Sequence, residues 1–386
     1  MSMEQPASKN PLGALTTQNR RVWAGARKHI TALSAKNATN LSIIDSALFC
    51  LCLDDTSINA ENPVSTIRNF LFDESINRWY DKSFSLIVSK DGTTGINFEH
   101  SWGDGVAVLR YFNEVYKETT TKPFVHPTTT ASVANVEGTV KFLEWDVDAQ
   151  MENDIKVAKE THSNIVNGID MNFLKYEGLN KAECKKYKVS PDSMMQLSFQ
   201  LGFYKQHKKF VATYESCSTA AFRHGRTETI RPCTTQTKEF CEQISLGSNR
   251  PSDKKLRKML DDCSAKHNEL TKEAAMGQGF DRHLLVLRKM IENCQFTRDF
   301  PMFFEDPAYA RINHNILSTS TLTSPALLAG GFGPVVKDGY GIGYNIQDTF
   351  LGCVVANYKS DRNGQEFIEC LKESYDEMAN VIRAKK

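Results

Sequence analysis

The stretch Phe98-Glu99-His100-Ser101-Trp102-Gly103-Asp104-Gly105 decides the fold and the chemistry that we expect of this chain. Two alternating runs separated by an Asp-Gly pair, Ser83–Ser89 and Thr94–Glu99, come before it and predict a β-hairpin. Apolar residues at helical spacing come after it and predict a helix over Val106–Tyr116. His100 therefore ends a strand and precedes a helix. A neutral imidazole there could remove a hydroxyl proton near neutral pH.

The rest of the chain shows the same mixture of helical and strand-like patterns. We expect further helices over Asn19–Leu33, Pro191–His207, Asp253–Ala275, Phe280–Glu292 and Glu366–Ala384. We expect further strands over Ile43–Leu53, Val140–Val147, Phe210–Ser216 and Gly341–Asn345. The mixture predicts an α/β protein, and the residues 119–139, rich in Thr, Ser and Pro, predict a linker between domains.

Composition excludes several classes of protein. A hydrophobic fraction of 40% is that of a folded chain, and 386 residues suffice for two or three domains. A formal charge of +1 gives no overall field for nucleic acid, so a phosphate site must be local. The 10 cysteines include no C-x-x-C pair, which predicts free thiols in a reducing compartment and no zinc site. No apolar run is long enough to cross a membrane, and the first residues do not have the pattern of a targeting signal.

Four blocks of sequence carry a resemblance to a known family. They are the H-x-x-x-D-G pattern at His100, Tyr214–Ala220 with Gly225–Thr229, Gly277–His283, and Leu317–Thr321 with Gly330–Pro334. In order and spacing the chain resembles the carnitine acyltransferases from about Asn10 to its end, and within that family it is most similar to the mitochondrial inner-membrane, palmitoyl-transferring type 2. The resemblance implies a chloramphenicol-acetyltransferase-like fold with mixed sheets flanked by helices. It also implies reversible transfer of a long-chain acyl group between coenzyme A and carnitine, in fatty acid transport and β-oxidation.

The resemblance also implies roles for the residues around the transferred group. His100 is the expected general base and Ser320 the expected donor to the oxyanion. Asp104 would support the site by pairing with Arg226 across the two domains. The carnitine carboxylate would be bound by Tyr214, Ser216, Thr227 and Arg282, and the trimethylammonium group by the face of Phe332. Taken singly, each of these hydroxyls is more often structural, and Phe332 could be a core residue beside a glycine turn.

Coenzyme A is expected to be bound by a short basic helix. Lys181 and Lys185 would share one helix face and hold its phosphates, and Asp192 would lie on the adenine side, although a run of lysines is more often a solvated surface. Gly330 would leave a tunnel open for a long acyl chain, although it could simply be a turn glycine. We expect no tightly bound cofactor, since the coenzyme A thioester is a substrate, and no metal or nucleic acid.

Members of the family are longer than this chain, so the resemblance implies an incomplete first domain. We expect a loose segment over residues 1–18, a remnant of the domain of the catalytic histidine with its linker over 19–139, and the domain of the carnitine and coenzyme A residues over 140–386. The resemblance places the protein on the matrix side of the mitochondrial inner membrane, with peripheral membrane association through a region absent here. The alternative is a truncated, non-catalytic module that binds carnitine and coenzyme A.

Overall fold

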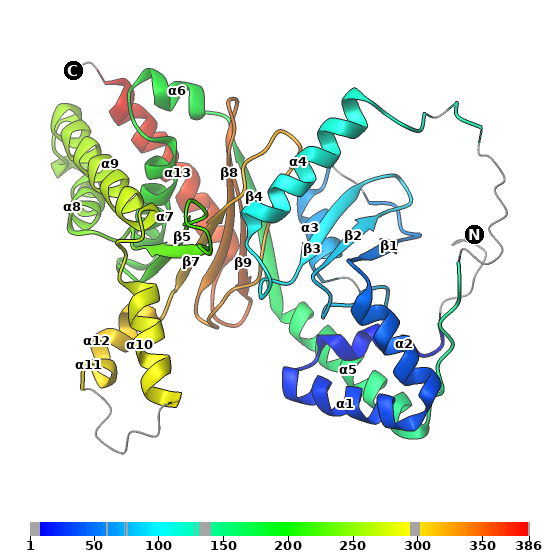
Figure 1. The fold of residues 1–386 in the computed structure, drawn as a ribbon. Coiled ribbons are helices and arrows are strands. Elements are labelled where there is room, and N and C mark those ends of the chain that lie inside the picture. The colour runs from blue at the N-terminus through cyan, green and yellow to red at the C-terminus, as the bar shows by residue number, and fades with distance from the viewer. Residues whose placement is uncertain are drawn as a thin grey trace. The chain divides into compact units, whose positions relative to one another are not determined.

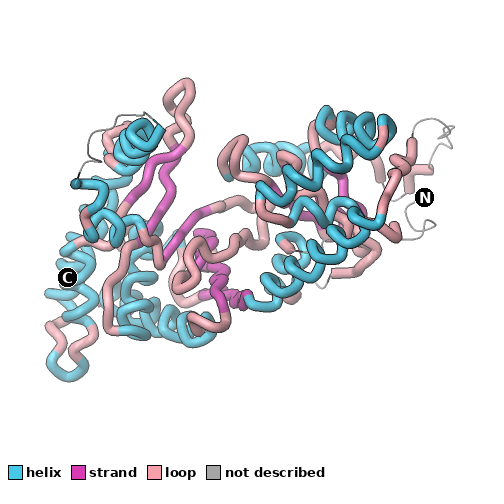
Figure 2. The backbone as a smooth tube through the Cα atoms, turned by 90° about the horizontal axis from the view of Figure 1, so that it is seen from below, coloured by secondary structure: helices cyan, strands magenta, loops and turns pink. Residues whose placement is uncertain are grey.

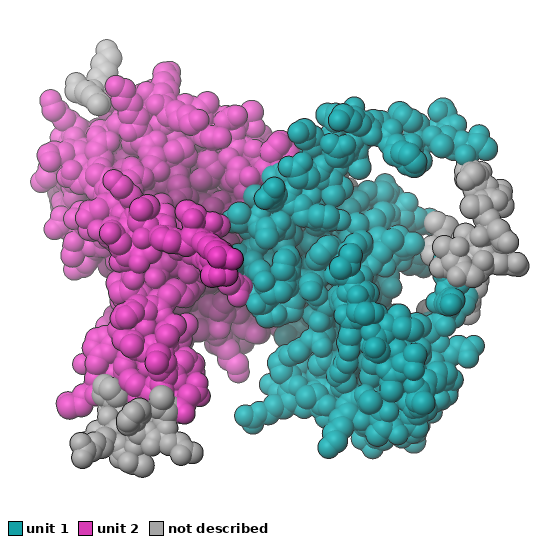
Figure 3. Space-filling model, in the orientation of Figure 1, with its two compact units in different colours: residues 1–167 teal, residues 168–386 magenta. Residues whose placement is uncertain are grey.

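The computed structural model describes residues 8–58, 61–72, 74, 76–126, 128–130, 140–293 and 302–384. Helices and strands are mixed along the whole chain (Figures 1 and 2), and the predicted α/β class with mixed sheets flanked by helices is confirmed. The chain divides into two compact units, residues 1–167 and 168–386 (Figure 3).

Unit 1 is built around a small sheet. Its elements are η2 (Leu12–Thr17, a 3-10 helix), α1 (Arg20–Leu33), α2 (Ala35–Ser46), β1 (Cys50–Leu53), α3 (Pro63–Leu71), β2 (Phe84–Val88), β3 (Thr94–Phe98), α4 (Gly105–Thr121) and α5 (Ala149–Gly168). The strand order is β1-β2-β3, with β1 parallel to β2 and β2 antiparallel to β3. The predicted hairpin is confirmed as β2 and β3. Gly92 in its turn has a φ of 82°, which glycine adopts without strain.

Helices α1, α2 and α5 of unit 1 form a hydrophobic cluster together with η2. Trp23 and Ile30 of α1 pack with Leu41 of α2 and with Met151 and Ile155 of α5. The predicted helix Asn19–Leu33 is confirmed as α1, and the Asn19 side chain caps it by accepting a hydrogen bond from the backbone N–H of Arg21.

Two strand predictions in unit 1 are wrong. Most of Ile43–Leu53 does not form a strand, since α2 extends to Ser46 and only the last residues form β1. A short apolar run does not by itself distinguish a helix from a strand. Val140–Val147 has no strand either. Its carbonyl groups at residues 144 and 146 instead accept hydrogen bonds from the side-chain amides of Asn40 and Asn37 at 2.7 and 2.8 Å.

The two ends of the predicted first domain also differ from expectation. Residues 1–18 do not form a loose segment throughout, since residues 12–17 form η2 and bury Leu12, Ala14 and Leu15 in the cluster of unit 1. Residues 1–7 and part of the predicted linker, residues 127 and 131–139, lie outside the described residues, while α4 reaches Thr121. The compact units divide at residues 167 and 168 rather than at 139 and 140, because the contacts of residues 144 and 146 with α2 join that segment to unit 1.

Unit 2 is larger and contains a six-stranded mixed sheet. Its elements are β4 (Ile169–Tyr176), α6 (Lys181–Lys186), α7 (Pro191–His207), β5 (Thr213–Ser218), β6 (Thr227–Ile230), α8 (Thr235–Ile244), η3 (Gly247–Asn249, a 3-10 helix), α9 (Asp253–Ala275), α10 (Asp281–Asn293), α11 (Met302–Glu305), α12 (Pro307–Asn313), β7 (Leu317–Thr321), β8 (Tyr340–Ile346), β9 (Leu351–Tyr358) and α13 (Gly364–Arg383). The strand order is β4-β9-β8-β7-β5-β6. β5, β7 and β8 run parallel to one another, and the other neighbouring strands are antiparallel.

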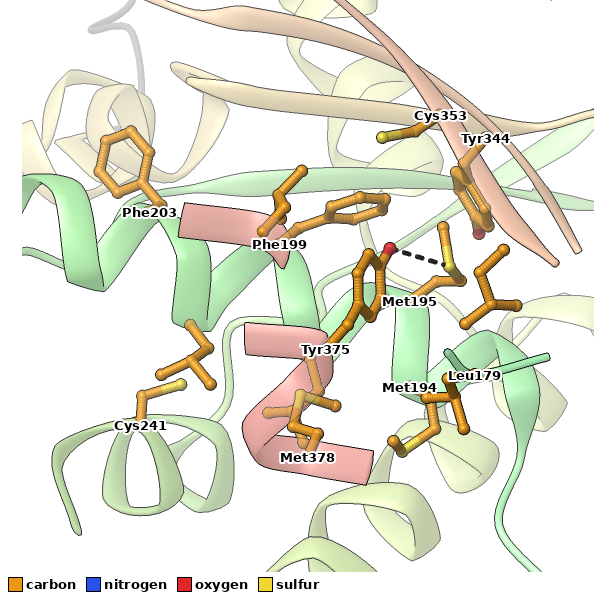
Figure 4. Packing of buried hydrophobic residues seen from close by; sticks show 14 of the residues in the cluster. Leu179, Met194, Met195, Phe199, Phe203, Cys241, Tyr344, Cys353, Tyr375 and Met378 are labelled. Atoms are coloured by element: carbon orange, nitrogen blue, oxygen red, sulfur yellow. Dashed lines mark hydrogen bonds between the residues drawn. The ribbon is translucent and has the colours of Figure 1, made fainter. Parts of the chain in front are cut away.

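One face of this sheet is covered by helices α7, α9 and α13 (Figure 1). The core between them is close-packed: the ring of Tyr375 on α13 points to Met195 on α7, and its hydroxyl lies 3.2 Å from the sulfur (Figure 4). Phe199 of α7 meets Tyr344 of β8 edge-on in the same core. The predicted helices Pro191–His207 and Asp253–Ala275 are confirmed. The 20-residue helix α13 buries a full face, as the sequence predicts for Glu366–Ala384.

Candidate active site

The second face of the six-stranded sheet carries a row of hydroxyl groups. Side chains alternate along a strand, and directly paired residues point to the same face. Tyr214 of β5 pairs with Ser318 of β7, which pairs with Gly341 of β8, and the register continues so that Ser216 and Ser320 share the same face. We call this the hydroxyl face. The sequence predicts Tyr214, Ser216 and Ser320 as site residues, and the sheet aligns all three on one surface.

Arg282 at the start of α10 contacts two of the other predicted carboxylate-binding residues, Tyr214 and Thr227. Its Nη2 donates to the Tyr214 hydroxyl at 3.0 Å and to the Thr227 hydroxyl at 3.1 Å. Its Nε also donates to the backbone carbonyl of Thr227 at 3.3 Å, and its own backbone N–H donates to Glu228 at 3.3 Å. A fixed guanidinium beside two hydroxyls forms a compact set of donors, which is the chemistry that binds a carboxylate.

A glycine-rich segment crosses the hydroxyl face and carries two further predicted residues. A Cβ atom on Gly341 would lie 2.7 Å from the carbonyl oxygen of Gly333 and 2.8 Å from that of Phe332. A Cβ atom on Gly343, the partner of Ser320 in the sheet, would overlap the carbonyl oxygen of Gly330. The backbone of residues 330–333 therefore lies directly on β8, and only glycines at 341 and 343 permit it to do so.

His100 and Asp104 lie together in unit 1. His100 follows β3, and its Nδ1 lies 3.4 Å from Oδ1 of Asp104, the residue that precedes α4. The side chain of Asp104 is only 17% exposed, whereas that of His100 is 67% exposed. The carboxylate thus lies beside Nδ1, and a role for it in orienting the imidazole stays a prediction. Arg226 belongs to unit 2, whose placement against unit 1 is not determined, so its pairing with Asp104 stays a prediction.

The predicted coenzyme A residues fall in two different surroundings. Lys181 and Lys185 both lie on α6, and the Nζ of Lys181 is 3.8 Å from the exposed carboxylate of Asp348. Asp192, in the first turn of α7, instead accepts a hydrogen bond of 2.7 Å from the hydroxyl of Tyr344. Asp192 thus reaches the helix-covered side of the sheet, while the two lysines lie on a surface helix. The roles of all three stay predictions.

The sequence reading missed a buried ionisable pair beneath β5. The carboxylate of Glu215 accepts from Nε2 of His267 on α9 at 2.8 Å, and the two side chains are 4% and 7% exposed. Burial raises the pKa of Glu215 to about 7, and its partner raises the pKa of His267 despite the opposing effect of burial. The only available signal was a charged residue between Tyr214 and Ser216, which strand alternation places on the opposite face.

Among the described residues, Asp192, Glu215 and His267 bring ligand atoms within 4.8 Å of one another, a spacing that a cation could use. His267 and Glu215 already bind each other, and Asp192 already binds Tyr344. We therefore treat the three side chains as a hydrogen-bonded cluster. The nine cysteines that the structure describes are all free thiols, and no described helix is long and apolar enough to cross a bilayer.

Comparison with known proteins gives a family. The family model for choline/carnitine O-acyltransferases matches residues 1–373. The chain belongs to the choline/carnitine O-acyltransferase family. Within this family it is similar to the carnitine O-palmitoyltransferase 2, mitochondrial, of Xenopus tropicalis and of Homo sapiens, with 46% and 45% identity over 385 residues. These alignments cover 100% of this chain and 57% of each relative, so the chain spans little more than half the length of these choline/carnitine O-acyltransferases.

Solved structures include one with a similar trace, the trichothecene 15-O-acetyltransferase of Fusarium sporotrichioides. It is 10% identical, with a TM-score of 0.46, over 91% of this chain and 79% of that one. The family resemblance drawn from the four sequence blocks is confirmed by the match to the choline/carnitine O-acyltransferase family. The roles of the individual residues remain predictions, which the geometry supports to different degrees.

Proposed function

We propose that this chain provides the carnitine site, the coenzyme A site and the catalytic histidine of a carnitine O-acyltransferase. The reaction would be the reversible transfer of a long-chain acyl group between coenzyme A and carnitine. The observation that carries the proposal is the donor set on unit 2, in which the Arg282 guanidinium binds the hydroxyls of Tyr214 and Thr227. A carboxylate placed there would gain one full charge and two neutral donors.

The other end of carnitine needs a different kind of surface. A trimethylammonium group cannot donate a hydrogen bond and is attracted to the face of an aromatic ring. The segment of residues 330–333 lies on the same sheet face as Tyr214 and Ser320, and Phe332 is its aromatic residue. We propose that Phe332 binds this cation. Ser320 would donate its hydroxyl hydrogen to the oxyanion that forms on the thioester carbonyl.

His100 would act as the base of the transfer. Asp104, whose Oδ1 lies 3.4 Å from Nδ1, would hold the ring, and Nε2 would take the proton of the carnitine hydroxyl as its oxygen attacks the thioester carbon. The tetrahedral oxyanion then collapses and the carbon–sulfur bond breaks. The departing thiolate receives the proton from Nε2, which leaves acylcarnitine, free coenzyme A and a neutral histidine. Running the same steps in reverse returns the acyl group to coenzyme A.

Coenzyme A, chain length and location complete the proposal. Lys181 and Lys185 share one face of α6 and would bind phosphate, while Asp192 would contact the coenzyme A molecule further along. Among the described residues, a Cβ atom at Gly330 would meet one atom within 4 Å, the Cδ1 of Leu322 at 3.6 Å, so the described neighbours do not fill this position. Space there suits a long acyl tail. The mitochondrial names of the relatives support a mitochondrial location.

The test is to incubate the chain with palmitoyl-coenzyme A and L-carnitine and to quantify palmitoylcarnitine by mass spectrometry. We expect product, and a loss of about 10²–10⁴-fold for His100→Ala. Calorimetry with L-carnitine, run in parallel, distinguishes an active transferase from a module that binds carnitine without catalysis. A chain that binds carnitine but forms no product is a non-catalytic binding module, and a chain that does neither overturns the proposal.

A further inference from the structure

The buried cluster beneath β5, made of Asp192, Glu215 and His267, is connected to the backbone of β5 by a series of hydrogen bonds between side chains. Tyr344 donates to Asp192 at 2.7 Å, and Gln196 of α7 donates to the Tyr344 hydroxyl at 3.1 Å and to the Thr319 hydroxyl at 2.9 Å. Thr319 in turn donates to the backbone carbonyl of Tyr214 at 2.9 Å. The path starts at the backbone of β5, runs through β7, α7 and β8, and reaches Asp192.

From Asp192 the path returns to β5. Its carboxylate lies within 4.8 Å of the ligand atoms of Glu215 and His267. Burial is the main cause of the raised pKa of Glu215, and the nearby Asp192 carboxylate adds to it. Glu215 is the residue that follows Tyr214, so both ends of the path lie on adjacent residues of one strand. Every side chain in it except that of Asp192 is buried. A network of this kind fixes the backbone it encloses, because each broken link leaves a buried polar group unsatisfied.

Strand β5 contributes to the hydroxyl face on one side and to the buried cluster on the other. Tyr214 and Ser216 point to the hydroxyl face, and Glu215 between them points to His267. A movement of Glu215 therefore shifts both neighbours, since all three share one extended backbone. We propose that Glu215 and His267, together with Asp192, are positioning residues that set the conformation of β5 and thereby the affinity of the hydroxyl face for carnitine. This inference rests on the proposed function.

The number of protons in the cluster determines its charge balance. Two carboxylates share one imidazole, so full ionisation leaves one negative charge in excess in a buried site. The groups that act on Glu215 come from three other elements and from β5 itself: His267 from α9, Asp192 from α7, Tyr344 from β8 and Cys217 from β5. The pKa values of the Tyr344 and Cys217 groups are raised, so both stay neutral. An extra proton on the two carboxylates balances the charge, and its loss as pH rises pushes the carboxylates apart.

The affinity for carnitine can report the protonation of the cluster. Its quaternary ammonium has no proton to lose and its carboxylate titrates far below neutral pH, so a change in affinity near neutrality reports on the protein. We expect the Kd of the chain for L-carnitine, measured by calorimetry, to rise about threefold or more between pH 6 and pH 8. Glu215→Gln mimics the protonated side chain. It should bind about as the parent does at the lower pH and should lose the pH dependence.

Three further measurements keep the test specific. Glu215→Ala removes the carboxylate that binds His267 and breaks the link that holds β5, so it should weaken carnitine binding about tenfold or more at every pH. Glu269→Gln removes an exposed carboxylate from the same helix, α9, and should behave as the parent does. Protection of the Tyr214 and Ser216 amides from hydrogen exchange should fall from pH 6 to pH 8 in the parent and not in Glu215→Gln.

The outcomes separate this inference from the proposed function. If the parent does not bind L-carnitine, the proposed function fails, and the exchange measurement alone then decides whether the cluster controls β5. The inference is overturned if the parent and Glu215→Gln show the same pH dependence of binding or of exchange. It is also overturned if folded Glu215→Ala binds carnitine as the parent does, or if a stoichiometric divalent cation proves to bind the three side chains.

Discussion

The contact between β8 and the segment of residues 330–333 gives a sharp test of the hydroxyl face. In Gly341→Ala, the new Cβ would lie 2.7 and 2.8 Å from the carbonyl oxygens of Gly333 and Phe332. A carbon and a carbonyl oxygen normally approach to about 3.3 Å, so the segment must move by about 0.5 Å. Both obstructing atoms belong to the backbone and cannot rotate away. Overpacking of this size costs about 1–3 kcal/mol of stability.

Gly333→Ala is the matched control. It adds the same methyl group to the same segment. Its backbone is not left-handed, and apart from its chain neighbours no atom of the described residues lies within 4 Å of its Cβ. Any gain from a stiffer unfolded chain is common to both variants, so their difference isolates the overlap at Gly341. We expect the control to stay within about 0.5 kcal/mol of the parent.

The assays are urea unfolding and calorimetry with L-carnitine. A loss of about 1–3 kcal/mol in the free energy of unfolding should lower the urea midpoint of Gly341→Ala. The slope of that free energy against urea concentration should stay unchanged. Because Phe332 moves with the segment, the affinity for carnitine should fall about tenfold, which corresponds to about 1.4 kcal/mol. If Gly341→Ala matches Gly333→Ala in both measurements, residues 330–333 do not lie on β8, and the placement of Phe332 beside the hydroxyls is wrong.

Four other perturbations test separate parts of the site. Thr227→Val keeps the side-chain volume and removes one hydroxyl beside the guanidinium, so the Kd for L-carnitine should rise by a factor of about ten while that for coenzyme A stays the same; equal carnitine affinity would place the carboxylate elsewhere. Joint substitution of Lys181 and Lys185 by alanine should weaken the binding of coenzyme A, less so at high salt, and should affect dephospho-coenzyme A less if the lysines bind the 3′-phosphate. Gly330→Met should lower the ratio of palmitoyl to butyryl transfer by orders of magnitude, because each methylene excluded from the tunnel forfeits about 0.8 kcal/mol; an unchanged ratio would exclude this position from the path of the tail. The folded chain holds a proton on Glu215 up to about pH 7, and the unfolded chain releases it near its ordinary pKa, so the free energy of unfolding should fall as pH rises through that window by up to about 1.4 kcal/mol per pH unit. Urea titrations at several pH values should show that the free energy of unfolding of Glu215→Gln depends less on pH than that of the parent. If the two proteins show the same pH dependence, the raised pKa of Glu215 is wrong.

Local pattern determined a large part of this protein. The hairpin of β2 and β3 follows from two alternating runs around Asp91-Gly92, and helices α7 and α9 follow from apolar residues at helical spacing. The same logic predicts that His100 ends a strand. The pattern failed where a run was short, as in Ile43–Leu53, because a few apolar residues fit either a helix or a strand.

The tertiary structure alone decided which residues meet. Strand alternation predicts that Glu215 faces away from Tyr214, but it cannot predict that His267, on a helix far along the chain, lies 2.8 Å from it. The donor set of Arg282 likewise joins residues 55 and 68 positions apart. The placement of residues 330–333 depends on the absence of side chains at Gly341 and Gly343. The sequence of the strand does not indicate that these two glycines make room for another segment. The periodicity of a helix or strand is local and can therefore be predicted from the sequence. Contacts between distant segments depend on how the sheet and its helices pack.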